Sequence, residues 1–121
     1  MIDNRTKGRS GEDMAVKYLK KHGYGVLERN YAGGGGEIDI VAYDTEYVIF
    51  VEVKSRFSLD FGYAAEAVDF QKRRKINQAA AIYIKQNRLY HRNVRFDVVE
   101  VYTGEKKIVH IKNAFDSYLR Y

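Results

Sequence analysis

The chain has 121 residues, a mass of 14.1 kDa and a hydrophobic fraction of 45%. This length suits one domain with its own core, so we expect a single domain over residues 1–121. The absence of cysteine excludes disulfide scaffolds, thiolate zinc sites and cysteine nucleophiles. No apolar run approaches the ~20 residues that span a bilayer, and the first residues are polar, so we expect a soluble cytoplasmic protein.

The first half of the chain predicts one helix and three strands. The helix is expected over 10–22, with Ser10 as its cap and Gly23 at its end. Strands are expected over 24–31, 37–43 and 47–54. In the first strand, alternation places Val26 and Arg29 on opposite faces. The glycine-rich loop over 32–36 is expected to be mobile, because glycine loses much conformational entropy on ordering.

The second half predicts a long helix and a hairpin. The helix is expected over 64–88, and the hairpin strands over 94–102 and 107–112. A tail rich in aromatic residues follows over 113–121. The order of helix, three strands, helix and two strands predicts an α/β fold with helices around one mixed sheet.

The net charge of +5 is unevenly distributed along the chain. Residues 1–36 hold seven basic and four acidic side chains, and residues 61–95 hold eight basic and two acidic. Between them, residues 37–60 hold two basic and six acidic. Carboxylates that bind a cation, flanked by lysines and arginines that bind a phosphate backbone, would produce this pattern. A solvated surface with random clustering would produce it too.

Charged residues also interrupt the strand that is expected to be buried. The apolar run 47–51 continues into Glu52, Val53 and Lys54. An even-numbered loop at Thr45-Glu46 would pair residues whose numbers add up to 91, so that Asp39 faces Glu52. Two carboxylates opposite each other destabilise a sheet unless a positive charge lies between them. A divalent cation with oxygen ligands is the simplest candidate, and Lys54 supplies a further positive charge nearby.

Two helical residues are candidates for the same site. Glu12 shares a helix face with Ala15 and Leu19, either as part of the site or as a first-turn acid that favours the helix dipole. Lys72 lies on the apolar stripe of the second helix, where it either snorkels to the surface or points at the carboxylates.

These segments resemble a known family. Asp39 followed after a hairpin by Glu52-Val53-Lys54 is the pattern of the PD-(D/E)XK nuclease superfamily, with Ile38 in place of the motif's proline. From about Gly8 to Tyr102 the chain looks like the YraN-like family of small bacterial proteins, which is largely uncharacterised. The segments that carry this resemblance are Gly11-Glu12-x-x-Ala15, Gly36-Glu37-Ile38-Asp39, Phe50-Val51-Glu52-Val53-Lys54 with Arg56, Ala67-Val68 followed by Lys72, and Arg95-Phe96-Asp97-Val98-Val99.

The resemblance implies a restriction-endonuclease-like αβββαβ core and a role for each site residue. Asp39, Glu52 and the Val53 carbonyl would bind Mg²⁺ or Mn²⁺, with Glu12 as a further acid at the metal, as in archaeal Holliday junction resolvases. Lys54 would orient or help deprotonate the attacking water. The residues expected to contact substrate are Lys72, Arg56, Lys75, Arg9 and Glu37.

We therefore expect a metal-dependent endonuclease acting on DNA, with branched or otherwise structured DNA as a candidate substrate and no membrane partner. The sequence leaves RNA as a substrate and a homodimer as open questions. One alternative is a nucleic-acid-binding module of the same fold that does not cut. Another is an adaptor that contacts a protein partner through Phe115, Tyr118, Leu119 and Tyr121, although packing of this tail on the protein's own core is the simpler expectation.

Overall fold

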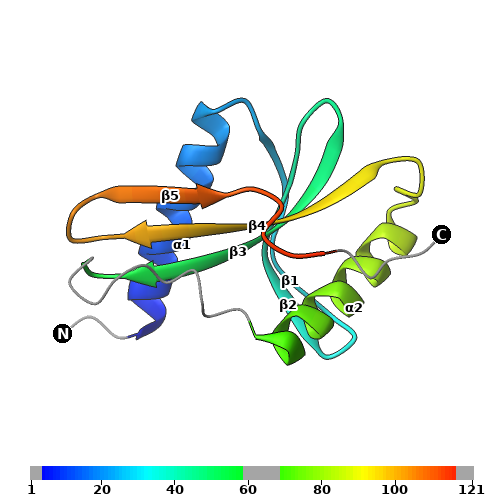
Figure 1. Cartoon of the computed structure of the whole chain (residues 1–121), viewed down its shortest axis with the longest axis horizontal. Coiled ribbons are helices and arrows are strands. Elements are labelled where there is room, and N and C mark those ends of the chain that lie inside the picture. Colours follow the sequence, from blue (N-terminus) through cyan, green and yellow to red (C-terminus); the bar gives the residue numbers. More distant parts are fainter. Residues whose placement is uncertain (1–3, 59–68, 117–121) are drawn as a thin grey trace.

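The computed structural model describes residues 4–58 and 69–116, with side chains from residue 10 onward. Two helices and five strands form a mixed α/β fold (Figure 1). In chain order the elements are α1 (Asn4–Lys21), β1 (Gly25–Gly33), β2 (Gly36–Tyr43), β3 (Tyr47–Arg56), α2 (Phe70–Gln86), β4 (Asn93–Tyr102) and β5 (Lys107–Ile111). The order of an αβββαβ core predicted from the sequence is therefore confirmed.

The five strands form one sheet in the order β1-β2-β3-β4-β5. All neighbouring pairs are antiparallel except β3 and β4, which are parallel. This parallel pair needs a crossover connection, and α2 provides it. The two helices cover opposite faces of the sheet, with α1 behind it in Figure 1 and α2 in front of β1 and β2.

Each face of the sheet has its own hydrophobic cluster. On the α1 side, Leu19 packs with Ile40, Ala42 and Ile49. On the α2 side the cluster comprises Ile38, Val41, Val48, Phe50, Ile76, Ala79, Ala80, Tyr83, Ile84, Phe96, Val98 and Phe115. Strand β3 contributes to both clusters, because it is buried on both faces as its apolar run predicts.

Both helices begin at residues other than those predicted. Helix α1 begins at Asn4, so Ser10 lies inside the helix and is not its cap. At Gly11 the helix lies so close to Ser55 of β3 that any side chain would collide with it. Helix α2 begins at Phe70, not at residue 64, because Asp69 is extended and its side chain accepts a hydrogen bond from the Lys72 amide. Residues 59–68, where the earlier start was predicted, lie outside the described residues.

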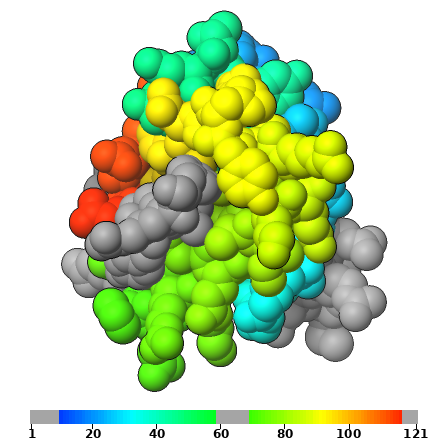
Figure 2. Space-filling view, turned by 90° about the vertical axis from the view of Figure 1, so that its right-hand side faces the viewer, coloured from blue at the N-terminus to red at the C-terminus, as the bar shows by residue number. Residues whose placement is uncertain are grey.

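The glycine-rich segment forms a tight turn, where a mobile loop was expected. Gly33 pairs with Gly36, and Gly34 and Gly35 between them have φ values of 59° and 79°. Positive φ at both central residues is typical of a two-residue hairpin turn that glycine adopts without strain. The hairpin tip lies against α2, since Gly34 contacts Ile82 and Gly36 contacts the Lys75 carbonyl. Figure 2 shows this tip in cyan beside the green helix.

A β-bulge in β1 interrupts the alternation of faces, so the predicted placement of Val26 and Arg29 on opposite faces is wrong. The register shifts between Val26 and Glu28, and the intervening Leu27 is exposed. Because of this extra residue, Val26 and Arg29 both lie on the α1 side: Val26 packs in the cluster of that face, and Arg29 contacts Glu12 of α1. The bulge therefore directs the guanidinium group of Arg29 toward α1.

The aromatic tail was proposed above either to contact a protein partner or to pack on the protein's own core. Phe115 is 7% exposed and stacks on Phe96, so this aromatic residue packs on the protein's own core, as the simpler expectation has it. Tyr118, Leu119 and Tyr121 lie outside the described residues. Among the helices that the structure describes, none has the length and hydropathy to cross a lipid bilayer.

Candidate active site

The site lies where β2 and β3 stop pairing. The antiparallel pairs run from Tyr43–Val48 to Ile40–Val51, which is the register predicted from the even-numbered loop. Directly beyond the last pair, the Asp39 Oδ2 atom accepts a hydrogen bond of 2.8 Å from the Val53 amide. A carboxylate thus takes the place of the next main-chain acceptor at the point where the two strands part.

Strand alternation changes at the same point. Ile40 packs on the α1 side of the sheet, whereas Ile38, two residues earlier, packs on the α2 side. On a regular strand these two residues would share a face. The strand therefore turns at Asp39, and the pKa of this residue responds to Glu52 on β3 and to Glu12 on α1.

Glu52 is the most buried acid of the site, with 6% of its surface exposed. It lies on the α2 side with Phe50, as the alternation predicts. Its Oε1 atom is 2.5 Å from the Lys72 ammonium and 3.8 Å from the Lys54 ammonium. A buried carboxylate is costly without such partners, so the two lysines stabilise its charge.

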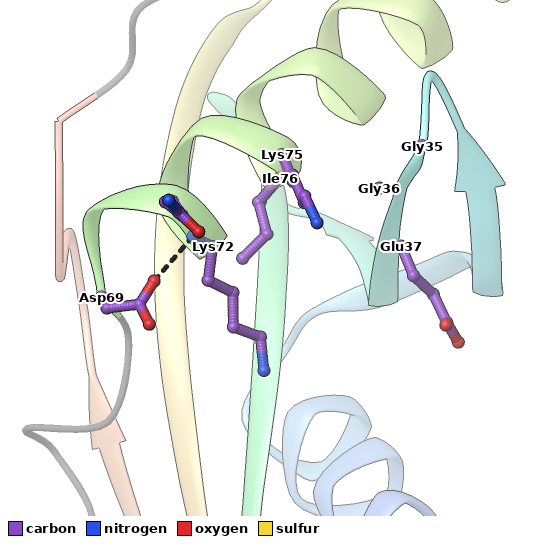
Figure 3. Close-up of a pocket in the computed structure, with 8 residues that line it drawn as sticks. Gly35, Gly36, Glu37, Asp69, Lys72, Lys75 and Ile76 are labelled. Carbon is purple, nitrogen blue, oxygen red and sulfur yellow. Dashed lines mark hydrogen bonds between the residues drawn. The ribbon is translucent and has the colours of Figure 1, made fainter.

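The cap of α2 positions Lys72. The Asp69 side chain fixes the first helical turn through the Lys72 amide, and Ile76 one turn later is buried in the core. The Lys72 side chain therefore extends from the helix start toward the strands, as Figure 3 shows. The sequence left open whether Lys72 snorkels to the surface or points at the carboxylates, and in the structure it points at Glu52.

The charges at the site shift each other's protonation. Burial and the neighbouring Glu52 raise the pKa of Asp39 to about 7. Burial and the adjacent Lys72 lower the pKa of Lys54. The pKa of Lys72 is raised, because hydrogen bonding and attraction to Glu52 outweigh the opposing effect of burial. The site thus brings together an acid that retains its proton easily and a lysine that loses its proton easily.

Glu12 is close to this pair but is held separately. Its Oε1 atom accepts hydrogen bonds from Arg29 at 2.9 Å and from Asn30 at 3.0 Å. Within 4–58 and 69–116, no three His, Cys, Asp or Glu residues are grouped so that they could hold a metal ion. Glu12 therefore acts on Asp39 through its charge, and not as part of a three-carboxylate cluster.

The remaining predicted contacts divide into three groups. Glu37 and Lys75 line a pocket of about 350 Å³ together with Lys72, between the β1–β2 hairpin and the start of α2 (Figure 3). Arg56 is exposed at the end of β3. The side chain of Arg9 lies outside the described part of the chain.

Sequence reasoning missed the two residues that hold Glu12. Arg29 and Asn30 are polar residues within a predicted strand, but only the bulge aims Arg29 at α1, and a bulge has no clear signal in this sequence. Asn30 has a φ of 53°, a conformation that asparagine tolerates better than most residues.

Comparison of the sequence with known proteins places this chain in a family. The model of the uncharacterised protein family UPF0102 matches residues 11–101, which include every predicted site residue except Arg9. The chain belongs to the UPF0102, or YraN-like, family. A UPF0102 protein of Clostridioides difficile is 51% identical over 94% of this chain and all of its own length. Others from Persephonella marina and Dictyoglomus turgidum are 44% and 42% identical, over 91% and 94% of this chain and 93% and 100% of their own.

The family description and the names of these UPF0102 relatives state no activity. An activity for this member must therefore be argued from the arrangement of its own residues.

Proposed function

We propose that this UPF0102 protein is a metal-dependent endonuclease that hydrolyses phosphodiester bonds in DNA, with branched or otherwise structured DNA as its substrate class. The observation that carries the proposal is the convergence of Asp39 and Glu52 with Lys54 and Lys72 at the point where two strands separate. Two acids and two lysines in contact have little structural use in a small domain, because apolar residues would stabilise the same space at lower cost.

The donor set fits a divalent cation. Burial and the neighbouring Glu52 raise the pKa of Asp39, so a cation beside the two carboxylates would favour its ionised form. Carboxylate and carbonyl oxygens are the ligands that Mg²⁺ and Mn²⁺ favour. The main chain of Val53 lies beside Asp39, since the Val53 amide donates a hydrogen bond to its Oδ2 atom. Asp39, Glu52 and the Val53 carbonyl would hold the cation, which would lower the pKa of bound water and neutralise the phosphate.

The lysines would act on the water and on the phosphate. The lowered pKa of Lys54 raises the fraction of its amine that is unprotonated, which suits a residue that orients and deprotonates the attacking water. Lys72 has a raised pKa and remains charged, which suits a residue that stabilises negative charge on the phosphate. Lys75 beside it would extend this positive surface along the pocket between α2 and the β1–β2 hairpin.

Cleavage of labelled branched, single-stranded and duplex DNA with Mg²⁺ or Mn²⁺ tests the proposal. We expect the wild type to cut at least one substrate and to lose this activity in EDTA. Asp39→Ala and Lys54→Ala should abolish cutting, whereas Lys85→Ala, at an exposed position in the last turn of α2, should not. Equal activity in the wild type and both site variants would overturn the catalytic assignment.

A nucleic-acid-binding module that does not cut is the second candidate. The ion pair between Lys72 and Glu52 favours it, since it leaves the carboxylate neutralised without a metal. Such a module would bind DNA with an affinity that falls steeply with salt, and it would produce no cleavage in either metal.

A further inference from the structure

A second open groove lies on the α1 side of the sheet. It has a volume of about 670 Å³ and separates α1 from the β4–β5 hairpin. Lys17 and Lys21 of α1 line one wall, and Lys106 in the hairpin turn lies on the other side. The described residues that line the groove include no carboxylate, and these three lysines form no ion pair with other described residues. The groove is therefore positively charged.

An aromatic pair lies in the same groove. The rings of Tyr18 and His22 are 4.2 Å apart at their centroids and are tilted by 35°. A partly buried chain of hydrogen bonds anchors Tyr18: its hydroxyl is 3.2 Å from His110 Nδ1, and His110 Nε2 is 2.7 Å from Asp97 Oδ2. Asp97 is fully buried and also accepts two hydrogen bonds from Arg95. The tyrosine is thus held in place from within the core, which lowers the entropic cost of binding a ligand against its ring.

One end of the groove lies at the end of β3 that carries Lys54, on the face of the sheet opposite Glu52 and Lys72. Thr103, at its near end, donates a hydrogen bond from its amide to the Arg56 carbonyl, two residues after Lys54. Ser10 lines the same end, where α1 packs closely on β3. From Ser10 to Lys21 the helix rises by about 16 Å at 1.5 Å per residue. A single nucleic-acid strand that leaves the site along α1 would place several of its phosphates beside the lysines.

We propose that this groove binds single-stranded nucleic acid next to the candidate cleavage site, with Lys17, Lys21 and Lys106 on the phosphates and the Tyr18–His22 pair against the bases. A positive groove with an aromatic platform is the usual means of binding single strands without sequence preference. The placement of the strand relative to the cut rests on the proposed function, whereas the binding itself does not.

The test is fluorescence anisotropy of a labelled single-stranded DNA oligonucleotide, measured in EDTA over a series of salt concentrations. We expect the double variant Lys17→Gln/Lys21→Gln to bind several-fold more weakly and the slope of log affinity against log salt to fall by about 1.4, which is ~0.7 per lost phosphate contact. The matched control is Lys85→Gln/Lys112→Gln, which removes two exposed lysines outside the groove and should keep the wild-type slope.

The aromatic platform has its own matched pair of variants. His22→Ala should weaken binding about five-fold or more, because it removes a stacking surface, whereas His22→Phe should retain most of the affinity. Thermal melting of each variant verifies the fold. Equal affinities and slopes in the groove variant and its lysine control, or equal affinities of His22→Ala and His22→Phe, would overturn the inference.

This experiment separates the groove from the active site. If groove variants lose DNA binding and the wild type never cuts with Mg²⁺ or Mn²⁺, the groove inference is supported and the nuclease proposal is wrong. If the wild type cuts and groove variants bind DNA as the control does, the nuclease proposal is supported and the groove inference is wrong. A wild type that neither binds nor cuts would overturn both.

Discussion

The Lys72 ammonium lies 2.5 Å from the Glu52 carboxylate, so the first turn of α2 neutralises a buried acid within the central strand β3. The residues are 20 apart in sequence and come from different layers of the fold. A cation that binds Glu52 must compete with this lysine. In the proposed metal-bound state, the lysine would be released from the carboxylate toward substrate.

Lys72→Met should tighten Mn²⁺ binding while it weakens DNA cleavage. Removing the competing charge favours the divalent ion by on the order of ten-fold, because like charges this close repel strongly even at an effective dielectric constant of ~20. Isothermal titration calorimetry with Mn²⁺ measures the first effect, and a cleavage assay the second. Lys75→Met is the control for the Mn²⁺ titration, since Lys75 lines the same pocket without an ion pair to Glu52. Unchanged Mn²⁺ affinity in Lys72→Met would count against this competition.

Asp39→Asn should stabilise the metal-free protein at pH 8. The folded pKa of Asp39 is about 7 against an ordinary value of 3.8, so the folded state binds a proton more tightly than the unfolded state. Ionising Asp39 therefore costs stability, and the cost grows as pH rises from about 4 to about 7. Asparagine avoids it and still accepts the hydrogen bond from Val53.

Urea unfolding in EDTA at several pH values measures this effect. The gain of Asp39→Asn is on the order of a few kcal/mol at pH 8 and vanishes near pH 4. Asp116→Asn, at an exposed position, should show no such trend. A gain independent of pH would show that Asp39 is not the titrating group.

Gly36→Ala should destabilise the protein by about 1–3 kcal/mol, because its methyl group would collide with the Lys75 carbonyl and force the hairpin away from α2. Gly35→Asn is the comparison: its Cβ atom would meet nothing within 4 Å, and asparagine tolerates a φ of 79°. Chemical denaturation of both variants measures the difference. Equal stability of the two variants would mean that the hairpin does not depend on its contact with α2.

Asp97→Ala should be the most destabilising of these changes, by about 3–5 kcal/mol, since it leaves the charge of Arg95 without its partner. Burial raises the pKa of Asp97, but hydrogen bonds from His110, Arg95 and the Asn113 amide outweigh burial and lower it below 3.8. The stabilisation is therefore complete at neutral pH and is lost as pH falls through the folded pKa.

Thermal melting from neutral pH to about pH 3 tests this prediction, with Asp116→Ala as the exposed control. The difference in unfolding free energy between wild type and Asp97→Ala should shrink on the acid side. A difference that stays constant with pH would mean that the charge of Asp97 contributes nothing.

The local sequence pattern predicted the type and order of the elements and part of the site, but not where the two helices begin. Alternation and the length of the turn predicted the register of Ile40 with Val51, because the side-chain period of a strand leaves few alternatives when both faces are buried. The same arithmetic brought Asp39 and Glu52 to one place. The buried run before Glu52 also indicated that its charge would need a partner.

Only the tertiary structure decided which groups act as partners. Lys72 reaches Glu52 because Asp69 fixes the helix start, and Glu12 is held by Arg29 because a bulge changes the face on which Arg29 lies. The four glycines order because α2 supports their turn. The uneven charge of the chain permitted a nucleic-acid partner, but it was packing between layers that collected the lysines of α1 and the β4–β5 turn along one groove. Such contacts join residues distant in sequence, and no local period encodes them.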